Sequence, residues 1–308
     1  METKKQDLKR VLIYVLVTFA LTWVYCLLVV YPLANGESLS GVPAVATQLL
    51  VAAAMFFPAI GVLLTRLITK EGFRNTWLKP NIKKRIRYYL LAWFGPAILT
   101  FAGIGVYFLL FPGHFDPDFG YFTATLEATG APMETLPIPI GMLMIVQCVQ
   151  AVFLAPVLNF VTCFGEEWGW RGYLLPKVSK HFSTIPTLLI TGIIWGLWHA
   201  PLTIIGHNYG LGYWGFPFTG IAMMCVFCIV LGIFLSYITL KTGSCIPAIL
   251  AHGAINGIAA IGIYFTYDGG NPFIGPAPTG IIGLIPFILA AIPMVIHLMK
   301  QEELEPHE

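Results

Sequence analysis

Charged residues are scarce in this sequence. Asp, Glu, Lys and Arg make up 10% of the 308 residues, whereas a water-soluble domain carries about 25%. Hydrophobic residues make up 57%, and the mean hydropathy is +0.79. So little charge cannot cover a water-soluble body of this length, which excludes a soluble globular protein. No polar stretch is long enough for a second domain, so residues 1–308 are predicted to form a single transmembrane domain.

Several familiar signatures are also missing. The sequence contains no phosphate-binding glycine loop, no nucleotide-binding fingerprint and no clear internal repeat. We therefore expect no nucleotide or nucleic-acid partner, and a transporter built from inverted halves is disfavoured. The six cysteines lie in or near apolar runs, and no disulfide framework is expected. The Cys225–Cys228 pair is interpreted as two small residues of a lipid-embedded helix, not as a redox or metal site.

Long apolar runs are what the sequence has instead. About 20 apolar residues span the hydrocarbon core of a bilayer. The first run follows a basic N-terminus and is too long for a cleaved signal peptide, so we interpret it as an uncleaved span. We predict an all-α polytopic membrane protein, with about eight transmembrane helices in one bundle around an internal polar site. Their approximate limits are Val11–Tyr31, Pro43–Leu64, Tyr89–Phe111, Ile138–Phe160, Ile185–Ile205, Phe218–Leu240, Ile246–Phe265 and Gly280–Leu298.

The positive charges provide an independent check of this span count. With eight spans the connecting segments alternate between two sides, and all 17 Lys and Arg residues then fall on one side. The other side carries acidic residues such as Glu37, Asp116 and Asp268. Because positively charged loops stay in the cytoplasm, both termini are predicted to be cytoplasmic. The basic segment Lys70–Arg87 is interpreted as an ordinary loop of that side, with an interfacial helix as the alternative.

Two adjacent carboxylates lie against the spans, where charge is costly: near the bilayer centre it costs roughly 2.5–3.5 kcal/mol. Glu166 and Glu167 follow the fourth span among aromatic and leucine residues. Glu167 and Arg171 are four residues apart and can pair on one helix face, whereas Glu166 points about 100° away. The pattern predicts a structural Glu167 and a Glu166 that is free for proton transfer. Two ordinary interfacial carboxylates beside a cytoplasmic Arg are an equal alternative.

Two histidines lie well inside spans. His199 follows Trp195 by one helical turn and precedes Pro201, and proline bends helices. His252 shares a helix face with Asn256, four residues later. Each of the two helices also carries a small-xxx-small pair, which allows close helix approach and which packing alone can explain: Gly192 with Gly196, and Gly253 with Gly257.

The depths of the two histidines disagree when they are counted along straight helices. At 1.5 Å per residue, His199 lies roughly 21 Å and His252 roughly 9 Å from the cytoplasmic ends of their spans. Shared chemistry therefore requires the fifth span to begin later, to tilt, or to bend near Pro186 or Pro201.

A hydrolytic site is the combination that these residues suggest. Glu166, His199, His252 and Asn256 come from three spans of an otherwise uncharged core. They could supply a general base, a partner that holds water, and neutral donors for an oxyanion. Alternatively, Glu166, His199 and His252 could hold zinc. Either arrangement suits the hydrolysis of a peptide bond.

These residues resemble the three motifs of the CAAX protease and bacteriocin-processing family, also called the abortive-infection family. The matching positions are Glu166-Glu167-x-x-x-Arg171, then His199 after an aromatic residue, then His252-x-x-x-Asn256. The resemblance covers roughly residues 164–257, within a family-like catalytic core of about 138–265. Trp195 stands where the family usually has Phe. The resemblance implies an eight-span intramembrane peptidase.

The resemblance also implies a role for each residue. Glu166 and His199 would activate the water, His252 and Asn256 would stabilise the oxyanion, and Glu167, Arg171 and Trp195 would support the site. Family members are described both as metalloproteases and as metal-independent peptidases. We favour a site that requires no cofactor, with zinc as the alternative, because an Asn in register with His252 suits an oxyanion and is a poor zinc ligand.

The predicted function is an intramembrane endopeptidase, a hydrolase that cleaves a membrane-associated peptide or protein near the cytoplasmic face. Its partners are that substrate and the lipid bilayer. The charge pattern suits a prokaryotic plasma membrane. Two alternatives stay open. One is an immunity or scaffold protein that binds through the same polar cluster without cleavage, and the less favoured one is a transporter with a histidine proton relay.

Overall fold

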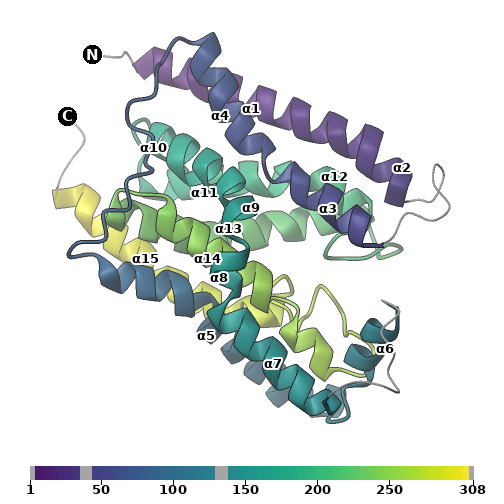
Figure 1. The fold of residues 1–308 in the computed structure, drawn as a ribbon. Helices are drawn as coiled ribbons and strands as arrows, with labels where there is room; N and C mark the ends of the chain where they lie inside the picture. The colour runs from purple at the N-terminus through teal and green to yellow at the C-terminus, as the bar shows by residue number, and fades with distance from the viewer. Residues whose placement is uncertain (1–3, 35–43, 129–137, 305–308) are drawn as a thin grey trace.

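The computed structural model describes residues 4–34, 44–128 and 138–304, which form a bundle of helices (Figure 1). Among these residues, six helical runs are long and apolar enough to cross a membrane. They coincide with six of the predicted spans, and the all-α polytopic architecture is confirmed. Their bounds are Lys4–Leu33, Gln48–Ile68, Ile86–Leu110, Phe218–Thr242, Ile246–Phe265 and Ile281–Leu304.

These six runs are not all single helices. The first contains α1 (Lys4–Tyr25), a π-helical turn (Cys26–Val30) and α2 (Tyr31–Ala34), and the second contains α3 (Ala44–Ala54) and α4 (Phe57–Ile68). Pro43, where the second span was predicted to begin, lies outside the described residues. The remaining four runs are α5 (Ile86–Leu110), α13 (Phe218–Thr242), α14 (Ile246–Ile258) with a 3₁₀ turn (Ile261–Phe265), and α15 (Ile281–Leu304).

The predicted fourth and fifth spans are broken into shorter helices. The fourth consists of α7 (Ile140–Phe153), α8 (Ala155–Leu158) and α9 (Phe160–Gly169), followed by a π-helical turn (Trp170–Leu174) and α10 (Leu175–Val178). The fifth consists of α11 (Thr184–Trp198) and α12 (Ala200–Ile204). Proline stands in the first turn of α8 and of α12, where its missing N–H group interrupts the preceding helix. The break between α11 and α12 falls at His199.

Both small-residue pairs serve close helix packing. A Cβ atom at Gly196 would lie 2.5 Å from the Cα atom of Cys225, so α11 could not lie this close to α13 with a larger residue there. Gly253 and Gly257 face α8 in the same way, with a Cβ at Gly253 3.0 Å from the carbonyl oxygen of Pro156. The two histidine helices therefore pack tightly against other helices, not against each other.

Contacts between loops at one end of the bundle confirm part of the predicted alternation. Lys177, after the fourth span, lies 3.0 Å from Asp7 in α1 and 2.6 Å from Glu71, which follows α4. Asn81, before α5, donates to the carbonyl oxygen of Thr242 at the end of α13. The start of α1 and the end of α15 lie at this same end, at the left of Figure 1. We call it the basic end.

Loops at the opposite end of the bundle join each other as well. The backbone N–H of Asp116, after α5, donates to the carbonyl oxygen of Phe265, and the hydroxyl of Tyr209, after α12, donates to that of Thr279. Three segments predicted to share the second side therefore meet.

Residues 69–85, here called the basic loop, join α4 to α5 without forming a helix. The interfacial-helix alternative for this segment is therefore wrong. The position of the loop on the cytoplasmic side stays a prediction. The loop is tied to the bundle because the N–H of Cys245 donates to the carbonyl oxygen of Trp77. Trp77 itself has a φ of 58°, in the left-handed region that bulky residues rarely adopt.

Candidate active site

The two adjacent glutamates lie near the end of α9, in the interior of the bundle. Glu166 is 2% exposed and Glu167 is fully buried. Glycines bring them there: a Cβ atom at Gly165 would lie 2.8 Å from the Cα of Phe56, and one at Gly169 would lie 2.6 Å from the Cβ of Pro58. Small residues at these positions let α9 settle against α4 and carry its carboxylates into the core.

Glu167 is the charged centre of the site. Its Oε1 atom accepts hydrogen bonds from Arg171 Nη1 at 2.9 Å and from His252 Nδ1 at 2.8 Å. The predicted pair of Glu167 with Arg171 is therefore present, and His252 joins it from α14. The Oε2 atom of Glu167 is buried with no hydrogen-bond partner among the described residues.

Glu166 is held by neutral donors. Its Oε2 atom accepts the indole N–H of Trp195 at 2.8 Å and, more weakly, that of Trp170 at 3.3 Å. Its Oε1 atom makes no hydrogen bond within the described ranges, yet it is not fully enclosed by protein. One oxygen of Glu166 thus fixes the side chain, while the other is available to a small polar molecule.

Trp195 contacts four other residues of the candidate site. Besides its hydrogen bond to Glu166, its ring lies 4.2 Å from the guanidinium carbon of Arg171, a cation–π contact. Its centroid is 5.8 Å from that of His199 and 5.4 Å from that of His252. A phenylalanine at this position would keep the ring contacts but would lose the N–H that holds Glu166.

His199 caps the end of α11, and its tautomer follows from its hydrogen bond. Nδ1 lies 2.9 Å from the carbonyl oxygen of Trp195, and because a carbonyl only accepts, Nδ1 carries the proton. The lone pair of the neutral ring is then on Nε2, which makes no hydrogen bond in the described structure and is not fully enclosed. The centroid of the His199 ring lies 4.7 Å from that of Trp198, and Cys228 Sγ lies 3.8 Å from Nδ1.

His252 and Asn256 lie one turn apart on α14. The carboxylate of Glu167 accepts from Nδ1 of His252, which again leaves Nε2 without a protein partner among the described residues. Asn256 is exposed, and its amide donates to the sulfur of Cys163 on α9 at 3.6 Å. Its side chain therefore lies at the junction of α9 and α14, three residues before Glu166 along α9.

The conflict between the depths of the two histidines disappears in the folded chain. Both rings lie less than 6 Å from the same indole. The count assumed that the helices run parallel, which they do not in this bundle (Figure 1).

The structure does not assemble the three candidate zinc ligands into one set. Within the described residues, no three His, Cys, Asp or Glu side chains come together in a way that could hold a metal ion. Glu166 is oriented by two indoles, and Nδ1 of His252 is committed to Glu167. These bonds use one atom of each side chain, and Glu166 Oε1 and Nε2 of His252 stay without a protein partner among the described residues.

Sequence reasoning missed several side chains of the site. Trp170 is four residues from Glu166, the same spacing that predicted the pair of Glu167 with Arg171, so this contact could have been found. Trp198 is the chain neighbour of His199, and its ring packs against the imidazole. Cys163 and Cys228 touch Asn256 and His199 through tertiary packing. The spacing of Cys225 and Cys228 gave no indication of this contact, and all six cysteines are free.

Comparison with known proteins identifies the core that carries these residues. Residues 148–258 match the family of type II CAAX prenyl endopeptidases described as Rce1-like. A 44-residue segment is 39% identical to a CAAX prenyl protease 2 of Methanococcus maripaludis, covering 14% of this chain and 16% of that relative. The matched family region contains every candidate site residue from Glu166 to Asn256. Through this core, and over less than half of its length, the chain is similar to the Rce1-like CAAX prenyl endopeptidases.

Proposed function

We propose that this protein is an intramembrane endopeptidase that cleaves a membrane-associated peptide or protein near the cytoplasmic face. One observation carries the proposal. Around a single indole, Glu166 Oε1 and the Nε2 atoms of His199 and His252 are left without protein partners among the described residues. Polar atoms in a protein interior are normally hydrogen-bonded to protein or to water. Incompletely enclosed atoms without protein partners therefore suggest a place for water and substrate.

The proposed first step is attack by water on the scissile carbonyl carbon. Glu166 Oε1 accepts one proton of the water, while the lone pair of His199 Nε2 accepts a hydrogen bond from the other. The water oxygen then forms a bond to the carbonyl carbon, and the carbonyl oxygen becomes an oxyanion. Proton transfer to a positioned base of this kind typically contributes about 10²- to 10⁴-fold to the rate.

His252 and Asn256 are proposed to stabilise that oxyanion. The Asn256 amide is a donor, and His252 donates from Nε2 when its ring is doubly protonated beside Glu167. The carbon–nitrogen bond then breaks, and the proton held by Glu166 passes to the departing amine. The immediate products are a carboxylic acid and an amine, and Glu166 returns to its ionised form. The carboxylic acid then gives its proton to the amine, which leaves a carboxylate and an ammonium group.

The reaction is proposed to need no metal, because the three candidate ligands do not come together as a ligand set among the described residues. We also propose where the protein and its two termini are located. The concentration of Lys and Arg at the basic end supports a cytoplasmic location for that end and for both termini. We further propose a prokaryotic plasma membrane, and a substrate anchored in it.

A cleavage assay with the purified full-length protein tests this function. The substrates are peptides anchored by an isoprenyl group, an acyl chain or a transmembrane segment. Glu166→Gln and His199→Ala should each reduce kcat/KM about 10²- to 10⁴-fold, the contribution of a positioned base. The control Glu127→Gln removes a carboxylate of α6 (Gly120–Ala128), which contributes no residue to the candidate site, and should leave kcat/KM unchanged. Equal cleavage by all four proteins would sink the proposal.

A further inference from the structure

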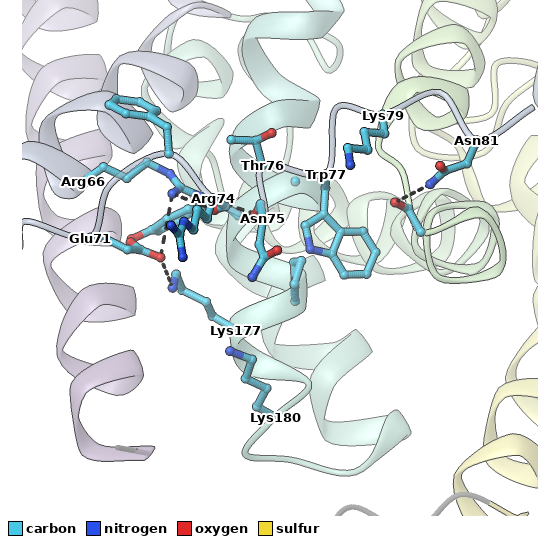
Figure 2. Close-up of a pocket in the computed structure, with 15 residues that line it drawn as sticks. Arg66, Glu71, Arg74, Asn75, Thr76, Trp77, Lys79, Asn81, Lys177 and Lys180 are labelled. Atoms are coloured by element: carbon cyan, nitrogen blue, oxygen red, sulfur yellow. Dashed lines mark hydrogen bonds and ion pairs between the residues drawn. The ribbon is translucent and has the colours of Figure 1, made fainter. Parts of the chain in front are cut away.

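A large pocket opens at the basic end, apart from the inner residues described above. Its volume is about 1160 Å³, and it lies between the basic loop and α10 (Figure 2). The wall formed by the loop includes Arg74, Trp77 and Lys79, and the facing wall includes Lys177 and Lys180. None of Glu166, Glu167, Trp195, His199 or His252 lines it.

The pocket carries an excess of positive charge. Five basic side chains line it, namely Arg66, Arg74, Lys79, Lys177 and Lys180, against one acidic side chain, Glu71. Asp7 lies behind the wall and pairs with Lys177 and Lys180, both at 3.0 Å. Even when Asp7 is counted, five positive charges face two negative charges.

The one lining carboxylate is already engaged. Glu71 accepts hydrogen bonds from Lys177 Nζ at 2.6 Å and from the hydroxyl of Tyr173 at 2.7 Å. Burial, together with the hydrogen bond to Glu71, raises the pKa of Tyr173 well above its ordinary value, so the phenol keeps its proton and donates. Glu71 is therefore not available to neutralise the rest of the pocket.

Two lining cations have no partner in the part of the chain that the structure describes. In the described ranges, the side chains of Arg74 and Lys79 make no hydrogen bond and no ion pair, and both are exposed. The backbone that carries them is nevertheless fixed, because Arg66 donates to the carbonyl oxygen of Gly72 at 2.6 Å and the N–H of Cys245 donates to that of Trp77. The backbone of Trp77 has a positive φ, a conformation that persists only where the surrounding structure imposes it.

Apolar side chains adjoin this charge. Phe73 lines the pocket and is 56% exposed, and Leu67 and Ile68 at the end of α4 are exposed as well. A soluble anion gains nothing from such neighbours, whereas a lipid gains a surface for its acyl chains. Basic pockets between transmembrane helices at the cytoplasmic side bind anionic lipid headgroups.

We propose that this pocket binds a phosphate-bearing anion, whose membrane source is the headgroup of an anionic phospholipid and whose soluble source is a free phosphate compound. Arg74 and Lys79 contact the phosphate, and the apolar rim contacts the acyl chains. The exposed apolar rim favours the lipid. This binding does not depend on peptidase activity, and its test needs no cleavage assay.

Native mass spectrometry of the delipidated full-length protein tests the proposal, with phosphatidylglycerol, phosphatidylcholine and inorganic phosphate as probes. Two charges near a membrane surface, at about 1 kcal/mol each, correspond to about a 30-fold change in Kd. Arg74→Gln/Lys79→Gln should weaken phosphatidylglycerol binding by about this factor, and each single variant about fivefold. The matched control Lys83→Gln/Lys84→Gln removes two exposed charges from the same loop outside the pocket and should change Kd less than about threefold.

The arms of the experiment separate the sources. Displacement of phosphatidylglycerol by millimolar inorganic phosphate assigns the pocket to phosphate itself, and resistance to displacement assigns it to the lipid. Equal binding of phosphatidylcholine, equal weakening by both double variants, or preferential binding of a peptide that offers only a C-terminal carboxylate overturns the proposal. Matching thermal unfolding of both variants and the parent confirms that these comparisons report binding.

Discussion

Two groups of buried charges lie in this protein, and they are neutralised in different ways. In the outer cluster, defined as Asp7, Arg10, Arg66, Glu71, Lys177 and Lys180, each carboxylate has at least two basic partners. In the inner cluster, defined as Glu166, Glu167, Arg171, Trp195, His199 and His252, two carboxylates have a single arginine. The indoles of Trp195 and Trp170 supply donors where cations are lacking.

The difference agrees with the proposed roles, in which the outer cluster holds helices together and Glu166 of the inner cluster accepts a proton. The outer cluster joins α1, the end of α4 and α10, and removing one cation leaves others in reach. The inner cluster orients Glu166 with neutral donors, which fix a carboxylate without neutralising its charge. An arginine paired with Glu166 would instead stabilise the anion and weaken it as a base. Variants within each cluster therefore test whether the two clusters have these different roles.

The largest effect is expected inside the inner cluster itself, between its two carboxylates. Glu167→Gln leaves the buried Arg171 and His252 without their charged partner, and breaking such a pair costs about 3–5 kcal/mol of unfolding free energy. Glu166→Gln keeps an oxygen for both indoles and should cost less than about 1 kcal/mol. Unfolding of both variants in mixed detergent and denaturant measures the difference. Equal stability of the two would contradict the division of roles.

In the outer cluster, two lysines that pair with the same carboxylate can be compared for their effect on stability. Lys177 and Lys180 both lie 3.0 Å from Asp7, but their side chains are 7% and 57% exposed. Lys177→Met should cost about 1.5–3 kcal/mol, because Asp7 and Glu71 each lose a charged hydrogen-bond donor but keep other basic partners. Lys180→Met should cost less than about 1 kcal/mol, as expected of an exposed pair.

The same unfolding experiment measures both lysine variants, and peptidase activity measured at a temperature where each variant is folded supplies the control. Lys177→Met should then cleave as fast as the parent, because the outer cluster holds helices together and does not reach substrate. Loss of activity from the folded variant would show that the two clusters are coupled.

Sequence reasoning succeeded where a pattern is local. Span positions follow from apolar runs, the sides of the loops from the Lys and Arg distribution, and the contact of Glu167 with Arg171 from helical spacing. It failed where contacts depend on how broken helices cross. The hydrogen bond of His252 to Glu167 joins residues 85 positions apart, and that of Trp195 to Glu166 joins residues 29 apart.

The outer cluster was missed for a different reason. Asp7 and Glu71 stand among many basic residues in segments that count as orientation signals. A charge count treats each of them as one more loop charge. Only the folded chain shows that Asp7 is buried, that the side chain of Glu71 is 9% exposed, and that Lys177 lies against both.

A smaller effect is expected from the indole that orients Glu166. Trp195→Phe keeps an aromatic ring near His199, His252 and Arg171 but removes the N–H bonded to Glu166. A hydrogen bond to a charged group contributes about 1.5–3 kcal/mol, so kcat/KM should fall about 10- to 100-fold. Because this loss reflects the orientation of the base, kcat should fall more than KM rises. A variant that changes only KM would place Trp195 in substrate binding instead.

The smallest effect is expected at the second indole. Trp170→Phe removes an N–H that lies 3.3 Å from Glu166, a longer and weaker contact than the 2.8 Å bond from Trp195. The ring of Trp170 also packs against Tyr14 and Trp198, and phenylalanine preserves part of that packing. We expect kcat/KM to fall less than about tenfold. A loss larger than that of Trp195→Phe would mean that Glu166 is held mainly from its own helix, so that α11 contributes His199 but does not position the base.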